Sequence, residues 1–317
     1  MAPLRRLRRI VVVALIVLAL PTGISFISTM TQPSNSTFAI QAFEWLRDHG
    51  AAGVAVQIED IYYSLNAPST GGPGLKTLPG RHKVAVVNLI HPANVVPAIY
   101  PPLPGEGVWA PSETWTGRAS PVQLATLRPD PNYPRMVAGV AWINTARTRI
   151  VLIPGRAEPN VTIPNRGPEQ VPTAGRGRLL ATFNSGFKLA DARGGFAYGG
   201  RTYAPLVDGM ATFVHYTNGK VNIISWTGSG QAPPGIDYAR QNLPLIVSGG
   251  RPNPNLSDGP EWGATLGNAI QVWRSAVGID RHGNLIYAAA NYQTVGSLAA
   301  IMIRAGAVRA MELDINT

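Results

Sequence analysis

The feature that most constrains the fold lies near the C-terminal end, where apolar segments are separated by short polar ones. Two such segments, 272–280 and 285–290, flank a short polar turn, and this pattern predicts a β-hairpin. Thr294 is placed to cap a helix over 295–305, because a threonine before an apolar run of helical spacing is a helix start signal. The apolar segment 307–313 then predicts another strand. Strand, turn, strand, helix and strand in this order indicate an α+β fold.

The rest of the body is rich in turns. The chain has 34 glycines and 28 prolines, and only 14% of its residues are charged. Asn218-Gly219 lies between two alternating segments and predicts a further hairpin over 211–226. We therefore expect one α+β domain, with a large mixed or antiparallel sheet and few helices. The chain has no cysteine, which excludes disulfides and thiol nucleophiles.

The N-terminal segment 1–30 predicts a signal anchor or a signal peptide. Uncharged residues fill 10–27, which is close to the shortest length that spans a bilayer. Basic residues before such a run predict a cytoplasmic N-terminus and an exported body. The body would be membrane-anchored if the segment is retained, and secreted if it is cleaved. The basic residues are Arg5, Arg6, Arg8 and Arg9. A polar linker follows at 31–37.

The segment 38–178 forms the N-terminal part of the body and contains long proline-rich loops. A helix is expected from residue 38 onwards, and a strand over 54–63. Trp109 and Trp115 lie in one of the loops and are candidate platforms for a sugar ring. The alternative is that they pack beneath the loop, which is the commoner use of tryptophan there.

The net charge of +10 points to anionic partners rather than to nucleic acid. Four of the arginines are at the extreme N-terminus, and no basic block alternates with aromatic residues elsewhere. A nucleic-acid surface is therefore not expected. A phosphorylated carbohydrate, an envelope polymer or a membrane surface fits the charge better.

Two carboxylates, Glu312 and Asp314, lie two positions apart at the end of the last predicted strand. Side chains at that spacing share one face of a strand. Such a pair can act as a general base, orient a water molecule, or hold a hard cation such as calcium. The alternative is a solvated strand end without a chemical role.

Arg274 and the Asn184 segment are further candidates. Arg274 shares a face of its predicted strand with small residues, which leaves space for a ligand, and its planar fork suits phosphate or carboxylate. The alternative is a structural ion pair with Glu312 or Asp280. Asn184, Ser185 and Gly186 follow the apolar segment 179–183, where glycine permits a ligand to approach the backbone.

Three segments together resemble the phosphodiester glycosidase family. They are Phe183–Phe187, Arg274–Asp280 and Leu313–Asn316, and the similarity extends over 179–317. The resemblance implies hydrolysis of a sugar-1-phosphodiester in cell-envelope or exopolysaccharide material. The family's glycine-rich end is missing here, because Asp314 is followed by Ile315, Asn316 and Thr317, where the sequence stops; the region is therefore expected to be truncated at its C-terminus.

The resemblance also implies a role for each candidate residue. The catalytic set is Asp314, Arg274 and Glu312, with Arg274 on the phosphate and Asp314 activating water or holding a cation. The substrate-binding set is Asn184, Ser185, Gly186, Arg274 and Asp280. Because the glycines after Asp314 are replaced, a non-catalytic module that binds carbohydrate or envelope polymer on the same fold is the alternative function.

Overall fold

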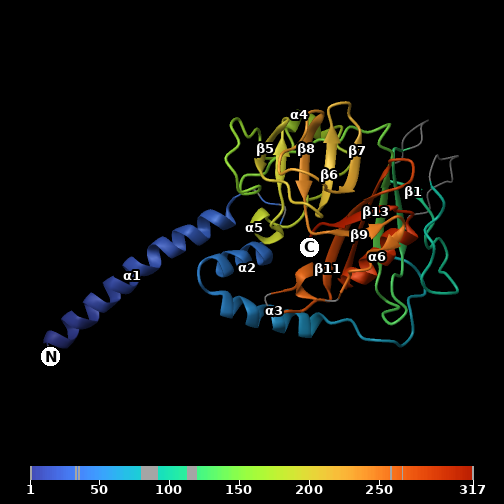
Figure 1. Ribbon diagram of the computed structural model, residues 1–317. Helices are drawn as coiled ribbons and strands as arrows, with labels where there is room; N and C mark the ends of the chain where they lie inside the picture. The colour runs from blue at the N-terminus through green and yellow to red at the C-terminus, as the bar shows by residue number, and fades with distance from the viewer. Residues whose placement is uncertain are drawn as a thin grey trace. The chain divides into compact units, whose positions relative to one another are not determined.

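The computed structural model describes residues 2–32, 34, 36–79, 92–112, 120–257, 259–265 and 267–315. Two compact units make up the chain. The first consists mainly of Met1–Asn66, and the second consists of Ala67–Ala264 and Ala269–Ile315. The predicted site lies entirely in the second unit, and Figure 1 labels several of the strands of this unit.

The first unit contains the helices α1 (Ala2–Met30), α2 (Phe38–Asp48) and α3 (Ala52–Asn66). Thr37 caps α2 by accepting a hydrogen bond from the backbone N–H of Ile40, which confirms the expected helix start. Trp45 of α2 packs edge-on against Phe26 of α1, with ring centroids 5.1 Å apart.

Two predictions for the first unit change. The predicted strand over 54–63 is wrong, since these residues belong to α3. Their large apolar side chains recur three or four positions apart, which is helical spacing, and no proline interrupts them. The predicted membrane span is not supported, because no helix in the described part of the chain combines enough length and apolar character to cross a bilayer.

The second unit is built from two antiparallel sheets, so the expected α+β fold with few helices is confirmed, with its strands divided between two sheets. The larger sheet has eight strands in the order β1-β2-β3-β12-β11-β13-β9-β10, and the smaller has five in the order β5-β4-β8-β6-β7. The strands of the larger sheet are β1 (Ala110–Pro111), β2 (Val122–Leu127), β3 (Ala138–Ile143), β9 (Leu245–Ser248), β10 (Arg251–Pro252), β11 (Val272–Ile279), β12 (Leu285–Gln293) and β13 (Arg309–Glu312).

The smaller sheet and the short helices complete this unit. The strands of the smaller sheet are β4 (Phe196–Tyr198), β5 (Arg201–Ala204), β6 (Ala211–Tyr216), β7 (Val221–Ser225) and β8 (Ile236–Gln241). The helices are α4 (Thr173–Arg176), α5 (Leu189–Ala192), α6 (Val295–Arg304) and the 3-10 turn η1 (Pro260–Trp262). The predicted hairpins are confirmed as β11–β12 and β6–β7. Thr294 caps α6 as expected, accepting from Ser297 N at 3.2 Å.

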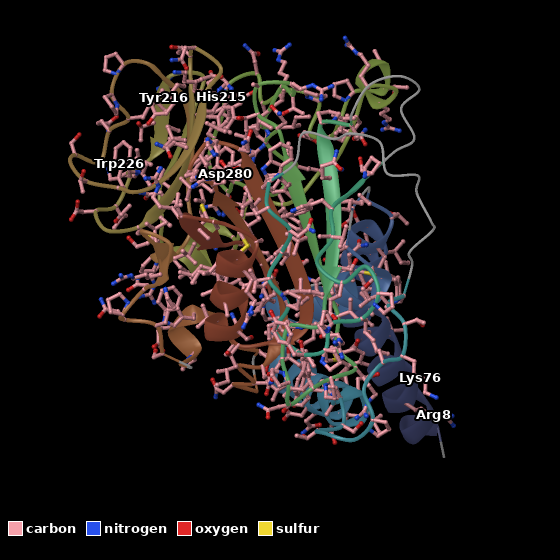
Figure 2. All side chains as sticks on the ribbon, turned by 90° about the vertical axis from the view of Figure 1, so that its right-hand side faces the viewer. Arg8, Lys76, His215, Tyr216, Trp226 and Asp280 are labelled. Atoms are coloured by element: carbon pink, nitrogen blue, oxygen red, sulfur yellow. The ribbon has the colours of Figure 1, made fainter. Side chains whose placement is uncertain are left out.

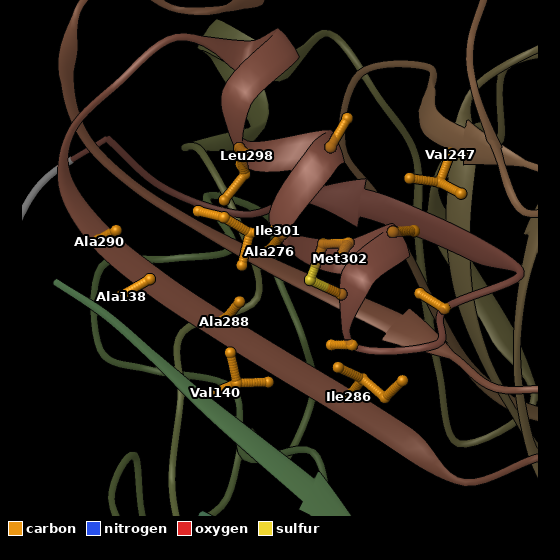
Figure 3. Packing of buried hydrophobic residues seen from close by; sticks show 14 of the residues in the cluster. Ala138, Val140, Val247, Ala276, Ile286, Ala288, Ala290, Leu298, Ile301 and Met302 are labelled. Atoms are coloured by element: carbon orange, nitrogen blue, oxygen red, sulfur yellow. The ribbon is translucent and has the colours of Figure 1, made fainter. Parts of the chain in front are cut away.

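Each face of the larger sheet has its own apolar core. One core lies between the two sheets and combines residues such as Phe213 and Ile223 of the smaller sheet with Val277 and Met311 of the larger. The other lies beneath α6, whose buried side chains pack on the alanine-rich face of β11 and β12 (Figure 3). Alternation along β11 therefore sends Ser275 and Val277 toward the smaller sheet, and Arg274 and Ala276 toward α6.

The loops differ from expectation in several places. The predicted strand 179–183 is wrong: these residues have irregular backbone, although Leu180 and Phe183 pack against the core between the sheets and the Phe183 ring lies 5.6 Å from that of Tyr287. Trp109 is 4% exposed and donates to the carbonyl of Ala93, so it packs beneath its loop. Trp115 lies outside the described residues.

Candidate functional site

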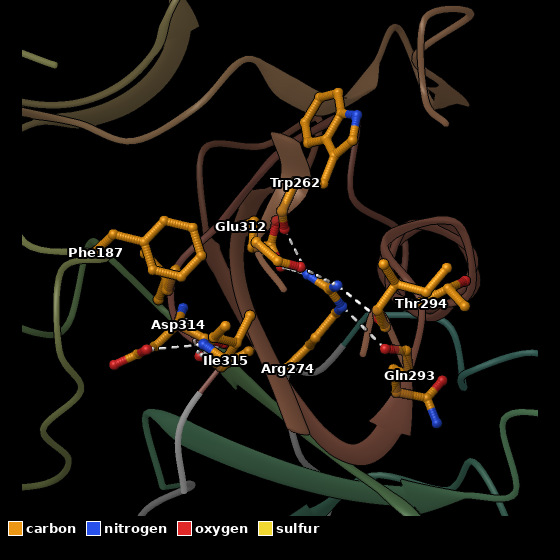
Figure 4. Close-up of polar contacts among 12 residues, drawn as sticks. Phe187, Trp262, Arg274, Gln293, Thr294, Glu312, Asp314 and Ile315 are labelled. Atoms are coloured by element: carbon orange, nitrogen blue, oxygen red, sulfur yellow. Dashed lines mark hydrogen bonds and ion pairs between the residues drawn. The ribbon is translucent and has the colours of Figure 1, made fainter. Parts of the chain in front are cut away.

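Arg274 is the most heavily hydrogen-bonded side chain of the predicted site. It is 1% exposed, and its Nε donates to the carbonyl of Gln293 at 2.9 Å. Nη1 donates to the carbonyl of Trp262 at 2.6 Å and to Glu312 Oε1, and Nη2 donates to the carbonyls of Gly263 and Ile270, each at 2.7 Å. Figure 4 shows several of these bonds.

These contacts assign a structural role to the guanidinium. An arginine has five N–H donors, and each of those of Arg274 is taken by the protein. The arrangement therefore does not favour the direct phosphate binding that the sequence suggested. Arg274 instead fixes the loop that ends at Gly263. A Cβ placed on Gly263 would lie 2.7 Å from the Phe187 ring and 3.2 Å from Ile315. This loop therefore packs against Phe187, which follows the Asn184 segment, and against Ile315, which follows Asp314.

Glu312 is the buried partner of Arg274. It is fully buried, and its Oε2 has no hydrogen-bond partner within the described residues. Burial raises the pKa of Glu312 to about 7, although the charge of Arg274 and its hydrogen bond oppose the rise; the Asp314 charge adds to it. Glu312 thus serves as a buried counter-charge with one unsatisfied oxygen.

Asp314 makes a different set of contacts. Its Oδ2 accepts a hydrogen bond from Asn184 Nδ2, which joins positions 130 apart in the sequence. Its Oδ1 accepts from the backbone N–H of Ile315 at 2.8 Å, and its own backbone carbonyl accepts from Ser275 N at 2.9 Å. The structure therefore brings Asn184 and Asp314 together, as the resemblance implied that both belong to one site.

The loop after Asn184 is held by Asn242, which the sequence did not single out. Asn242 is fully buried, and its Nδ2 donates to the carbonyls of Glu312 at 2.8 Å and Leu313 at 3.1 Å. Its Oδ1 accepts from Phe187 N at 3.3 Å. Gly186 has a φ of +119°, and a Cβ there would lie 2.8 Å from Asn242 Cγ. The glycine is therefore required for this close contact.

Glu312 and Asp314 do not act as a pair on one face. The strand β13 ends at Glu312, so the two-residue alternation does not continue to Asp314. Figure 4 shows the Asp314 side chain directed away from the Arg274–Glu312 pair. Among the described residues, no group of three or more histidines, aspartates or glutamates is placed to hold a metal ion. The suggested calcium site therefore finds no converging ligands here.

Asp280 lies outside the site. It follows the last residue of β11 and is five residues from Ser275, about 17 Å at ~3.3 Å per residue. Figure 2 labels Asp280. Its carboxylate accepts from Trp142 Nε1 at 3.0 Å and from the backbone of His282 and Asn284 at 2.8 and 2.9 Å. Although burial acts to raise it, these hydrogen bonds lower the pKa of Asp280. It fixes the β11–β12 turn, and its predicted role in substrate binding does not fit this position.

Tyr287 is a further residue of the site that the sequence did not indicate. Burial is the largest cause that raises the pKa of its phenol; a hydrogen bond with Ser275 acts to lower this pKa, and the charge of Asp314 acts to raise it. The phenol is therefore neutral at physiological pH and can donate a hydrogen bond. The signal was present in the alternation of β12, since Tyr287 pairs with Val277 and shares its face toward the smaller sheet.

The second unit is thus a two-sheet α+β domain in which the Asn184 amide and the Asp314 carboxylate form a hydrogen-bonded pair. Residues 180–314 match the family model described as phosphodiester glycosidase. The family supports a glycosidase-type hydrolytic function. The comparison also agrees with the resemblance seen in Phe183–Phe187 and Arg274–Asp280.

No curated protein matches the chain. Among solved structures, the catalytic domain of zebrafish N-acetylglucosamine-1-phosphodiester alpha-N-acetylglucosaminidase, auto-inhibited by its pro-peptide, is 14% identical with a TM-score of 0.42. That alignment covers 66% of this chain and 75% of the zebrafish chain. A hypothetical protein from Synechocystis is 16% identical with a TM-score of 0.32, over 57% of this chain and 54% of its own.

Proposed function

We propose that this protein hydrolyses a sugar-1-phosphodiester. The observation that carries the proposal is the contact between Asn184 and Asp314, which come from two separate motifs of a family-matched region and meet beside Ser275 and Tyr287. In the reaction, the bond between the anomeric carbon and the phosphate oxygen breaks and water adds to that carbon. The products are a free sugar and a phosphomonoester.

The chemistry suits a site with one oriented carboxylate. Phosphate is a good leaving group, so a strong general acid is less necessary than in ordinary glycoside hydrolysis. The Asp314 carboxylate, fixed by Asn184 and by the N–H of Ile315, orients the attacking water and stabilises positive charge on the sugar ring. The neutral Tyr287 phenol donates a hydrogen bond to the substrate.

The substrate in this proposal is cell-envelope or exopolysaccharide material. The support is the N-terminal sequence, where a basic flank precedes the uncharged residues 10–27, as is typical of a segment that directs export. The phosphorylated carbohydrate is consistent with the positive net charge of the chain.

A turnover assay tests the proposal. Methyl esters of hexose and N-acetylhexosamine 1-phosphates are incubated with the full chain, and free reducing sugar is measured. Asp314→Asn is expected to lower kcat by about 100-fold or more, the usual contribution of a positioned acid–base group. Asp237→Asn is the matched control, since Asp237 lies on β8 and contacts His215 rather than the Asn184 loop. Equal activity of Asp314→Asn and wild type would refute the assignment.

A non-catalytic carbohydrate-binding module is the second candidate. It is favoured by Ile315, which takes the place of an expected glycine and packs its side chain near Gly263 beside Asp314. A side chain at this position narrows the space in which a substrate can reach the carboxylate. Saturable binding of the esters without release of free sugar would support this second function over hydrolysis.

A further inference from the structure

Arg240 is a buried cation with no paired carboxylate among the residues that the structure describes. It lies on β8 and is 4% exposed. Its Nη1 donates to the carbonyl of Gln241 and its Nη2 to the carbonyl of Phe187. Within the described residues, the other N–H groups of its guanidinium have no hydrogen-bond partner, and no carboxylate lies within ion-pair distance.

The other buried arginines of this unit are balanced differently. Arg128 is paired with Glu106, and Arg274 is paired with Glu312. A buried charge without a partner is strongly destabilising, because desolvation is not offset by a counter-charge. Burial lowers the pKa of Arg240 to about 10, while the more distant Glu158 opposes this change, so the side chain is still charged at neutral pH. Its position is therefore suited to an anion that the protein does not itself supply.

Arg240 and Asp314 both contact the loop that carries Asn184 and Phe187. Arg240 pairs in register with Phe213 and lies two residues from Tyr238 on the same strand. Both of these residues belong to the core between the sheets, so Arg240 also faces the larger sheet. Through Phe187 it contacts the loop that carries Asn184. Asn242 binds the N–H of that same Phe187 and the carbonyl that precedes Asp314.

We propose that Arg240 binds the phosphate of the substrate through its unused N–H donors, while Arg274 only positions the site. The inference rests on the proposed function for the identity of the substrate, but the anion subsite is a separate property. A guanidinium presents a planar fork that matches two phosphate oxygens, and the bound anion supplies the missing counter-charge. Asp314 then lies on the sugar side of the bond that breaks.

Binding of inorganic phosphate to the full chain tests the subsite by calorimetry. Arg240→Gln is expected to weaken phosphate binding about 10- to 100-fold, the range for loss of a charged hydrogen-bond donor. Arg240→Lys keeps the charge but not the fork and should give an intermediate value. Arg309→Lys is the matched control, because Arg309 also donates to carbonyl and amide oxygens but from β13 to β7, away from the Asn184 loop.

A second variant guards against simple misfolding. Glu158→Gln removes the negative charge that acts on Arg240, and the amide oxygen can still accept from Leu189 N, as the carboxylate does at 3.2 Å. This variant should bind phosphate more tightly than wild type, a gain that unfolding does not produce. Thermal unfolding of each variant is followed in parallel.

The outcomes separate the subsite from the proposed function. Phosphate binding that depends on Arg240, without turnover of any ester, supports the subsite and refutes hydrolysis. Turnover with phosphate binding that is the same in Arg240→Gln and wild type supports hydrolysis and overturns the subsite. Absence of phosphate binding by the wild-type chain also overturns it, as would a Glu158→Gln variant that binds less tightly.

Discussion

Replacing Glu312 with glutamine should abolish one particular dependence of stability on pH. The folded-state pKa of Glu312 is about 7, above its ordinary value of 4.5, so between these values the folded protein holds a proton that the unfolded chain has released. The free energy of unfolding therefore falls as the pH rises from 4.5 to 7 and levels off above that. Over this interval the loss is about 3 kcal/mol, at ~1.4 kcal/mol per pH unit.

Urea unfolding, followed by tryptophan fluorescence at several pH values from 4.5 to 8, measures this effect. The quantity to compare is the difference in free energy of unfolding between wild type and Glu312→Gln, because other groups titrate equally in both. The difference should shift by about 3 kcal/mol in favour of the variant across the interval. If the two curves run parallel, the carboxylate is ionised throughout and burial does not raise its pKa.

Glu106 offers a control with the opposite sign. It is also buried beside an arginine, but both of its oxygens accept hydrogen bonds, from Arg128 and from Leu103 N. Although burial acts to raise it, these bonds lower the pKa of Glu106. Its contribution to stability is therefore present above pH 4.5 and is lost as the pH falls. Glu106→Gln should change the pH dependence only in the acid range.

Three further predictions concern single positions. Gly186→Ala should destabilise the protein by about 1–3 kcal/mol and lower activity, because a Cβ at φ +119° would meet Asn242; urea unfolding and turnover measure both effects. Gly278→Ala should cost about 1–3 kcal/mol by overpacking against Met302, 2.6 Å from the new Cβ, with kcat of the remaining folded protein unchanged. Thr294→Ala should cost about 1 kcal/mol through the lost cap of α6, measured by thermal unfolding.

Local patterns predicted the parts of the fold that are held by local physics. The β11–β12 hairpin follows from alternation around a polar turn, and α6 follows from Thr294 and helical spacing. The apolar run 179–183 predicts a strand, but such a run does not reveal whether a partner strand is free to pair with it. The apolar content of 54–63 also predicts a strand, whereas the three- to four-residue spacing of its large side chains fits the helix α3.

The candidate site is predictable from the sequence only in part, because motifs show residue types but not the backbone groups around them. Motif order placed Asn184 and Asp314 in one site, and their hydrogen bond agrees with that placement. The sequence could not show that four backbone carbonyls converge on Arg274 and occupy it, since carbonyls exist at every residue. Nor could it separate Asn242 from other polar loop residues, because its importance lies in the distant backbone that it joins.

The position of β13 has a consequence for how the protein is made. Although it comes last in sequence among the strands, β13 is inserted between β9 and β11 and pairs with both. Until it is synthesised, these two strands present unpaired edges, which are sites of aggregation in incomplete sheets. The larger sheet can close only after residues 309–312 leave the ribosome. A chain stopped shortly before them would lack Asp314 and would also expose two apolar edges, so loss of solubility should accompany loss of the site.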